Sequence, residues 1–167
     1  YIDAYVVNRG PGSYTGVRIA MGVLKTFAQV HQKPVVTVDS LELLAGQIVS
    51  LKKDFPVLLN CTRSEVFHAR YSIIDGIAVA RTPILLTSLE KFLESSRDKA
   101  VVLHRVNLER RKVEPLFEKL KLLPLDYPIA DALLLDRIGE HKLKSCEIDI
   151  NATVNPLYVK RDVEKRK

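Results

Sequence analysis

The sequence predicts a mixed α/β fold built from parallel strand–helix–strand units, and three observations support this. Two apolar runs, residues 1–8 and 34–38, have the composition of buried strands. Each is followed by a stretch with helical periodicity, residues 13–32 and 40–52. Strands that alternate with helices at this spacing pair in parallel, and three consecutive strand candidates then follow.

Composition and cysteine content limit the classes of protein to which the chain can belong. The chain has 167 residues, 47% apolar and 28% charged, which is enough to bury a core without cross-links. It shows no signal peptide and no apolar run near the ~18 residues that cross a bilayer, so we expect a cytoplasmic protein without membrane contact. Cys61 and Cys146 are the only cysteines, and they form no CxxC motif or Cys/His cluster. This usage fits a reducing compartment and argues against a zinc site or a disulfide scaffold.

The net charge of +6 is modest, and much of it lies in the last eight residues, KRDVEKRK. Five basic residues stand there beside two acidic ones. We interpret this segment as a solvated terminus, and a contact with an RNA backbone is the alternative.

After residue 38 the sequence predicts one more helix and then several strands in a row. Ser40 is the expected N-cap of the second helix. Three strand candidates follow at residues 56–62, 65–74 and 77–86. Asp75-Gly76 between the last two is a strong signal for a two-residue hairpin.

The remaining third of the chain alternates again. Thr87 and Ser88 are candidate caps for a helix that ends near Ser95. We expect a strand at residues 100–104 and helices at 108–122 and 129–144, the two helices being separated by Pro124 and Pro128.

The segment NRGPGSYTGVRIAMG, residues 8–22, raises the question of a phosphate-binding loop. It lacks the lysine of a Walker A loop, and the dinucleotide fingerprint GxGxxG fails at its third glycine. We therefore predict a structural turn from strand to helix, with no cofactor. Gly12 and Gly16 are expected to supply positive φ or close packing, and Ser13 or Thr15 to cap the helix. The residues of this turn are Gly10, Pro11, Gly12, Ser13, Thr15 and Gly16.

The helix after the turn is apolar around about 220° of its circumference, whereas a helix on a sheet needs only about 100–140°. Its main apolar face contains Val17, Ala20, Met21, Leu24, Phe27 and Ala28. We expect Val17, Met21, Leu24 and Ala28 to pack on the sheet. The opposite flank is predicted to be a protein interface that consists of Ile19, Val23, Thr26 and Val30. Periodicity alone leaves open whether another part of the same chain or another protein covers it.

Several motifs carry a resemblance to a known family. The segment RGPGSYTGVRIAMG followed by SLELLA resembles the signature of TsaB (YeaZ) proteins, SEVFHARY resembles their GEVY-type strand, and NPLYVKRDV resembles their PxYLR-type ending. The match covers nearly the whole chain. It implies the actin-like ATPase, RNase H-like fold with two related subdomains, of which the first is truncated by roughly 50 residues at its start. The expected division, near Asp54-Phe55-Pro56, assigns residues 1–54 to the first subdomain and 55–167 to the second.

The resemblance also implies a function. TsaB-like proteins are non-catalytic partners that bind and activate TsaD, the enzyme that makes threonylcarbamoyladenosine at position 37 of tRNAs reading ANN codons. The implied partners are a TsaD-like protein, a TsaE-like ATPase through the complex, and tRNA indirectly. A homodimer is a further possibility, and the sequence does not decide between the two assemblies or on direct contact with tRNA.

No catalytic, cofactor-binding or metal-binding residue is predicted. The two metal-binding histidines of TsaD correspond here to Ser40 and Leu44, whose side chains cannot form an imidazole site. His31, His68, His104 and His141 show no metal-ligand spacing. We interpret Glu42 as a first-turn glutamate favoured by the helix dipole, since no nearby motif places a second acid with it.

Two rival functions belong to other classes. An active ATPase or kinase-like enzyme of the same fold needs an acidic N-terminal hairpin that this sequence lacks. A peptidase needs a metal pair or a nucleophile with its base, and neither pattern occurs in the sequence. Residues Asn60–Ser64 depart from the family's DAR-like triplet and the glycine that follows it, since both the acid and the glycine are absent. Arg63 is a candidate to replace the family's arginine, and we interpret the segment as a strand-connecting turn.

Overall fold

A computed structural model describes residues 1–48, 54–96, 100–104, 121–125, 131–149 and 154–159 of the chain. It forms two compact units. The first consists of Tyr1–Leu43 with Pro128–Tyr158, and the second of Leu44–Tyr127 with Val159–Lys167. Each unit has its own sheet, and each is described separately below.

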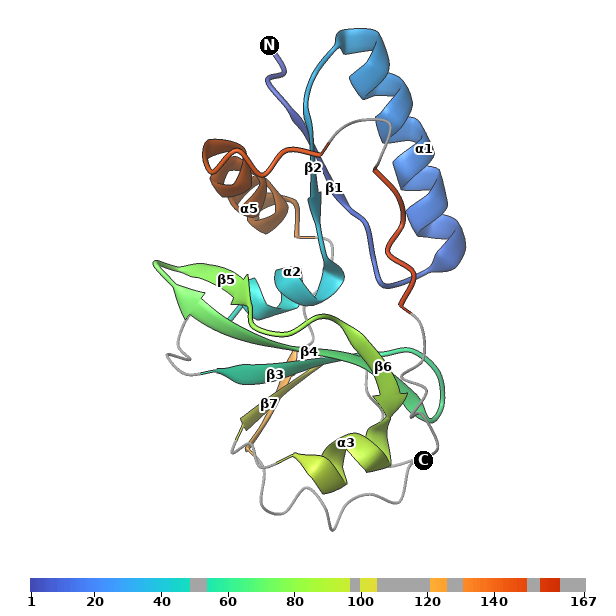
Figure 1. Cartoon of the computed structure of the whole chain (residues 1–167), viewed down its shortest axis with the longest axis vertical. Helices are drawn as coiled ribbons and strands as arrows, with labels where there is room; N and C mark the ends of the chain where they lie inside the picture. The colour runs from blue at the N-terminus through green and yellow to red at the C-terminus, as the bar shows by residue number, and fades with distance from the viewer. Residues whose placement is uncertain (49–53, 97–99, 105–120, 126–130, 150–153, 160–167) are drawn as a thin grey trace, which may run out of the picture. The chain divides into compact units, whose positions relative to one another are not determined.

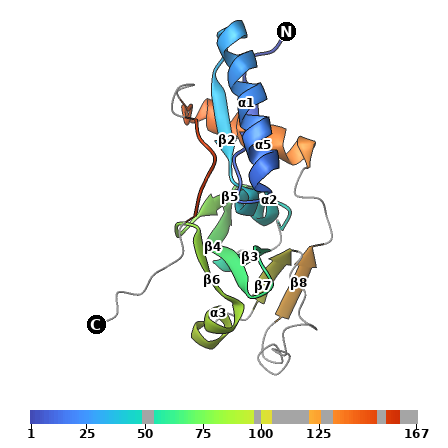
Figure 2. The ribbon, with the colours of Figure 1, turned by 90° about the vertical axis from the view of Figure 1, so that its right-hand side faces the viewer.

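The first unit contains the predicted strand–helix–strand motif. Strand β1 (Tyr5–Asn8) pairs in parallel with β2 (Val35–Val38), and α1 (Tyr14–His31) connects them. The register runs from Tyr5 opposite Val35 to Asn8 opposite Val38. Helix α5 (Ala132–Lys144) packs on the same two strands. Figures 1 and 2 show α1 and α5 on opposite sides of this pair of strands.

The pleat of the two strands divides their side chains between the two helices. Val7 and Val35 pack with Met21, Leu24 and Ala28 of α1, together with Val154. On the other face, Val6 and Val38 pack with Ile138, Leu134 and Leu135 of α5 and with Leu43. Successive residues of a strand point to opposite faces, so a strand covered on both sides is mostly apolar, as these two are apart from Asn8 and Thr37.

Helix α5 approaches β1 closely at one glycine. A Cβ atom added to Gly139 would lie 2.4 Å from Cγ2 of Val6, a separation that real side chains do not adopt. The absence of a side chain at this position therefore allows the helix to lie directly against the strand.

The second unit is built on one mixed sheet with the strand order β5-β4-β3-β7-β8, and β6 also pairs with β4. Its elements are β3 (Phe55–Asn60), β4 (Glu65–Ile74), β5 (Ile77–Ala80), β6 (Leu85–Ser88), α3 (Leu89–Ser95), β7 (Ala100–His104) and β8 (Lys121–Leu125). The predicted Asp75-Gly76 hairpin is confirmed: both residues have positive φ, 50° and 77°, as a primed two-residue turn requires.

The third strand of the expected meander, residues 77–86, is two strands in the structure. Strand β5 pairs with the second half of β4, and β6 pairs with the first half. Between them the Arg81 amide donates to the carbonyl of Arg70, and the Arg70 amide donates to the Thr82 hydroxyl. The hydroxyl takes the place of a ladder acceptor, which keeps the amide of Arg70 satisfied where the strand is interrupted.

Two expectations about the later part of the chain need correction. The helix predicted at residues 108–122 lies mostly outside the described residues, but its last two residues belong to strand β8. Pro124 lies inside β8, which is acceptable because β8 is at the end of the described sheet order. The expected division assigned all residues after 54 to the second subdomain, whereas α5 packs on β1 and β2 in the first unit.

Candidate functional site

The glycine-rich turn between β1 and α1 positions the start of the helix. Gly10 has a φ of +98° and precedes a cis peptide bond to Pro11, and its amide donates to the side-chain oxygen of Asn8 at 2.8 Å. Ser13 is the N-cap of α1, and its hydroxyl accepts from the amide of Gly16 at 3.3 Å. Of the two candidate caps, Ser13 has this role, and Thr15 lies within the helix.

The glycine that requires special backbone freedom is not one of the two that we expected. Neither Gly12 nor Gly16 has a positive φ, and Gly12 has no atom within 4 Å of an added Cβ. The expected close packing does occur at Gly16, where an added Cβ would lie 3.3 Å from the Ser13 hydroxyl oxygen. The positive φ falls at Gly10 instead. The chain reverses direction at the end of β1, so the residue that turns it is the one closest to the strand.

One face of α1 packs on the sheet, as the sequence predicted. Met21, Leu24 and Ala28 are buried, Val17 is half-buried, and all four contact the core of the first unit. Ala20 and Phe27, which were expected on this face, are exposed instead. They lie about 60° or more from the centre of the buried face, so the flat sheet does not reach them.

The opposite face of α1 is apolar and exposed. We call Ile19, Val23, Thr26 and Val30 the α1 seam. Its three aliphatic side chains are 62%, 50% and 69% exposed in sequence order. The four seam residues are spaced by four, three and four positions. This spacing places them on one line along the helix, about 160° from the buried face. The seam is therefore a separate surface and not the margin of the core.

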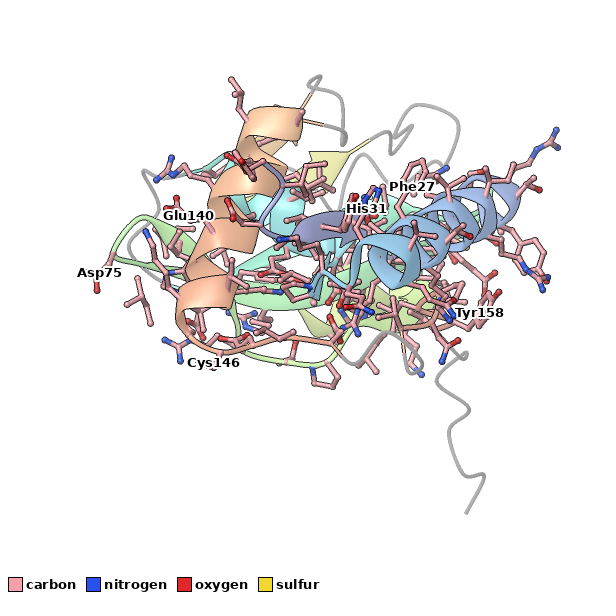
Figure 3. The ribbon with its side chains drawn as sticks, turned by 90° about the horizontal axis from the view of Figure 1, so that it is seen from above. Phe27, His31, Asp75, Glu140, Cys146 and Tyr158 are labelled. Atoms are coloured by element: carbon pink, nitrogen blue, oxygen red, sulfur yellow. The ribbon has the colours of Figure 1, made fainter. Side chains whose placement is uncertain are left out.

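Thr26 within the seam and Phe27 beside it are both compatible with an apolar surface. The Thr26 hydroxyl donates to the carbonyl of Gly22 at 3.0 Å, so its polar group is satisfied within the helix. Phe27 is 49% exposed, and its ring stacks against Tyr5 and His31 with centroid separations of 6.3 and 6.1 Å. Figure 3 shows Phe27 and His31 beside each other on α1. Rings held by their neighbours lose little entropy when a partner covers them.

A polar cluster lies at the carboxyl ends of β1 and β2. The Arg9 guanidinium donates to Asp39 at 2.6 Å, and this hydrogen bond raises the pKa of Arg9. The Lys142 ammonium lies 2.8 Å from Glu42 and also donates to the Thr37 carbonyl at 3.1 Å. Sequence reasoning missed Lys142, because it comes from α5, a hundred residues after its partner, and no local motif marks it.

Glu42 is buried in this cluster at the first turn of α2 (Ser40–Gly46). Burial raises its pKa above the ordinary 4.5, and the ion pair with Lys142 opposes that shift. Its Oε2 atom also accepts from the amide of Asp39 at 3.3 Å, which is one of the two hydrogen bonds of a capping box with Asp39 at the N-cap position. The cap expected at Ser40 is thus one residue earlier. A second acid, Asp39, does lie close to Glu42, contrary to expectation, but both carboxylates face a cation.

Ser40 and Leu44, the positions that the family resemblance aligns with metal-binding histidines, are buried. Ser40 donates its hydroxyl to the Asn8 side-chain oxygen at 3.0 Å, and Leu44 is fully enclosed. In the part of the chain that the structure describes, no three His, Cys, Asp or Glu side chains are grouped as a metal site would need. No described helix has both the length and the apolarity of a membrane span.

The altered segment Asn60–Ser64 connects β3 to β4. The amides of Ser64 and Glu65 both donate to the Thr62 hydroxyl, at 3.4 and 3.2 Å. The Cys61 amide donates to the Glu65 carbonyl at 3.1 Å. The Thr62 hydroxyl thus stabilises a compact turn between the two strands, in line with the expected strand connection.

Comparison with known proteins gives three findings about this chain. Residues 1–80 match the model of the TsaD family, described as tRNA N6-adenosine threonylcarbamoyltransferase. The chain is 31% identical over 117 residues to the tRNA threonylcarbamoyladenosine biosynthesis protein TsaB of Bacillus subtilis, covering 68% of this chain and 51% of that protein. It is also 38% identical over 76 residues to an uncharacterised protein of Mycobacterium tuberculosis, covering 46% of this chain and 34% of that protein.

The fold is similar to that of solved structures. YeaZ from Pseudomonas aeruginosa superposes with a TM-score of 0.75 at 21% identity, covering 95% of this chain and 74% of that one. A second structure, from the same organism and described as similar to peptidase YeaZ, superposes with a TM-score of 0.76 at 20% identity. The chain spans about half the length of the Bacillus relative.

Proposed function

Because the chain belongs to the TsaB (YeaZ) family and has its actin-like, RNase H-like fold, we propose that it is a non-catalytic subunit in threonylcarbamoyladenosine biosynthesis. It binds and activates a TsaD-like enzyme, which modifies position 37 of tRNAs that read ANN codons. A TsaE-like ATPase and tRNA join through that complex, in the cytoplasm.

The α1 seam is the observation that carries this proposal. Single exposed apolar residues are common on protein surfaces, but contiguous ones on one helix face mark interaction sites. Complete burial of Ile19, Val23 and Val30 would contribute about 1.5–3 kcal/mol each before the costs of association. A second helix with a matching apolar stripe would fit the spacing of the seam.

The polar cluster supports a binding role over a catalytic one. A general acid or base must be able to reach a substrate and exchange a proton with it. Glu42 and Asp39 are instead held by Lys142 and Arg9, and Glu42 also caps a helix. Ser40 and Leu44, at the positions of the metal-binding histidines, supply no metal ligand of that kind.

Co-purification tests the proposal directly. The full chain and the TsaD-like protein of the same organism are co-expressed, and the complex is measured by size-exclusion chromatography with light scattering. We expect a heteromeric complex that Val23→Asp abolishes, since an unpaired charge would enter the seam. Circular dichroism of the variant should remain unchanged, because Val23 is half exposed.

Leu133→Asp is the matched control. Leu133 is an exposed leucine, 83% accessible, on α5 and outside the seam, so this variant should retain the complex. If Val23→Asp retained it as well, the seam would not be the interface. If Val23→Asp unfolded the chain, the two faces of α1 would be assigned the wrong way round. A complex of two copies of this chain without the enzyme would favour the homodimer.

A further inference from the structure

A second surface of α1 is distinct from the seam and has different chemistry. Tyr14, Arg18, Lys25 and Gln29 fall within about 60° of the helix circumference, roughly 110° from the seam. Tyr14 and Tyr158 are 60% and 58% exposed, and their ring centroids are 5.8 Å apart. Figure 3 shows Tyr158 beside α1 and well separated from Phe27 and His31. Two half-exposed rings thus meet at the N-terminal end of the helix.

Arg18 is held against the Tyr14 ring. Its guanidinium carbon lies 5.0 Å from the centroid of the Tyr14 ring, and its Nη1 donates to the Tyr14 hydroxyl. Tyr14 and Arg18 are both exposed, so the cation is accessible to a ligand. Stacked guanidinium and aromatic planes are a recurrent surface for unpaired bases, because every base offers a π-face.

Helix α1 brings no acidic side chain to this surface. Helix α1 contains Arg18, Lys25 and His31 but no aspartate or glutamate. A protein partner that covered this face would have to pair Arg18 and Lys25 with acids, whereas RNA supplies phosphates at regular intervals.

We propose that this surface, Tyr14, Arg18, Lys25 and Tyr158, binds single-stranded RNA directly. The two tyrosine rings stack on unpaired bases, and the two cations contact the phosphates on either side. This goes beyond the proposed function, in which tRNA joins only indirectly through the enzyme. The seam stays free for the protein partner, since the two surfaces lie on different faces of α1.

The test measures binding of the purified full chain to a fluorescein-labelled single-stranded RNA 12-mer and to a tRNA transcript, by fluorescence anisotropy over a salt series. We expect Tyr14→Leu and Tyr158→Leu each to raise Kd about fivefold or more, without changing the salt slope. Arg18→Gln should reduce the slope of log Kd against log salt by about 0.7, because one phosphate contact is lost.

Matched variants separate this site from general attraction to a basic protein. Tyr14→Phe and Tyr158→Phe keep the rings and should bind nearly as the wild type does. Arg137→Gln removes an exposed cation from α5 and should change neither Kd nor slope appreciably. Equal effects of Arg137→Gln and Arg18→Gln, or wild-type affinity of both leucine variants, would overturn the proposal.

The outcome is distinguishable from failure of the proposed function, because RNA binding is measured without the enzyme. A chain that forms the TsaD-like complex but binds no RNA at low salt contradicts only this inference. If the tyrosine variants lost the protein complex while RNA affinity was unchanged, the surface would belong to the protein interface and the inference would be wrong.

Discussion

Helices α1 and α5 cover opposite faces of the same two strands, but their outer faces differ. The outer face of α5 carries charges, including an i,i+4 pair in which Lys144 lies 2.6 Å from Glu140 and lowers the pKa of that carboxyl. The outer face of α1 carries Ile19, Val23, Phe27 and Val30, all exposed. Packing on the strands requires only one apolar face of each helix. The second apolar face of α1 therefore needs another explanation, and a protein partner provides one.

The inner faces differ as well. Helix α1 meets the strands through the side chains of Met21, Leu24 and Ala28. Helix α5 also packs through side chains, but in addition its backbone approaches Val6 closely at Gly139. Side-chain truncation should therefore damage the α1 contact most, and side-chain addition should damage the α5 contact most.

Adjacent residues of α1 give the largest expected contrast. Leu24→Ala should lower the free energy of unfolding by about 2–5 kcal/mol, because it leaves a cavity against Val7 and Val35. Val23→Ala should change it by no more than about 0.5 kcal/mol, since Val23 faces outward. Chemical denaturation of both variants makes the comparison. Equal losses would mean that the two faces of α1 are not distinct.

Gly139→Ala should destabilise the first unit by about 1–3 kcal/mol, because the new methyl group collides with Val6. The double variant Gly139→Ala, Val6→Ala should recover part of the loss by making room for it. Thermal unfolding monitored by circular dichroism measures both effects. A Gly139→Ala protein as stable as the wild type would show that α5 can shift away from β1 at no cost.

The two N-caps offer a smaller contrast. Asp131 accepts from the amides of Leu133 and Leu134 at 3.0 and 3.1 Å, whereas Ser13 accepts from one amide at 3.3 Å. Each alanine substitution should cost about 0.5–2 kcal/mol, Asp131→Ala more than Ser13→Ala. Thr15→Ala is the control for α1, since Thr15 is not the cap. A larger loss from Thr15→Ala than from Ser13→Ala in urea unfolding would contradict this capping assignment.

The ion pair between Lys142 of α5 and Glu42 of α2 is expected to have the smallest effect on the free energy of unfolding, and this effect depends on pH. Burial raises the pKa of Glu42 above the 4.5 of an ordinary glutamate, so the folded chain holds this proton more tightly than the unfolded chain does. The contribution of Glu42 to stability is therefore complete below pH 4.5. It declines as pH rises through the pKa that Glu42 has in the folded chain.

Glu42→Gln should remove this dependence. The unfolding free energy of the wild type, relative to the variant, should fall as pH rises from about 4.5 towards 7. Urea titrations at several pH values measure the difference. A difference that grows with pH would mean that the ion pair with Lys142 outweighs the cost of burial and that the pKa of Glu42 is lowered.

Much of the fold could be predicted because it depends on local sequence. Apolar runs and helical periodicity located β1, α1 and β2, and Asp75-Gly76 located the hairpin, since only a few residues adopt positive φ readily. The face of α1 that packs on the sheet followed from its spacing alone. Strand β8 and the interruption between β5 and β6 could not be predicted, because pairing with distant strands defines them.

The sequence by itself determined which residues form strands and helices near the glycine-rich turn, and that α1 is apolar on two sides. Tertiary structure alone decided what meets those sides. It placed α5 on β1 and β2, required a glycine at position 139, and joined Lys142 to Glu42 and Asp149 to Thr37 across separations of 100 and 112 residues. The physical reason is range: backbone preference and periodicity act over a few residues, whereas burial and ion pairing depend on neighbours that only the folded chain brings together.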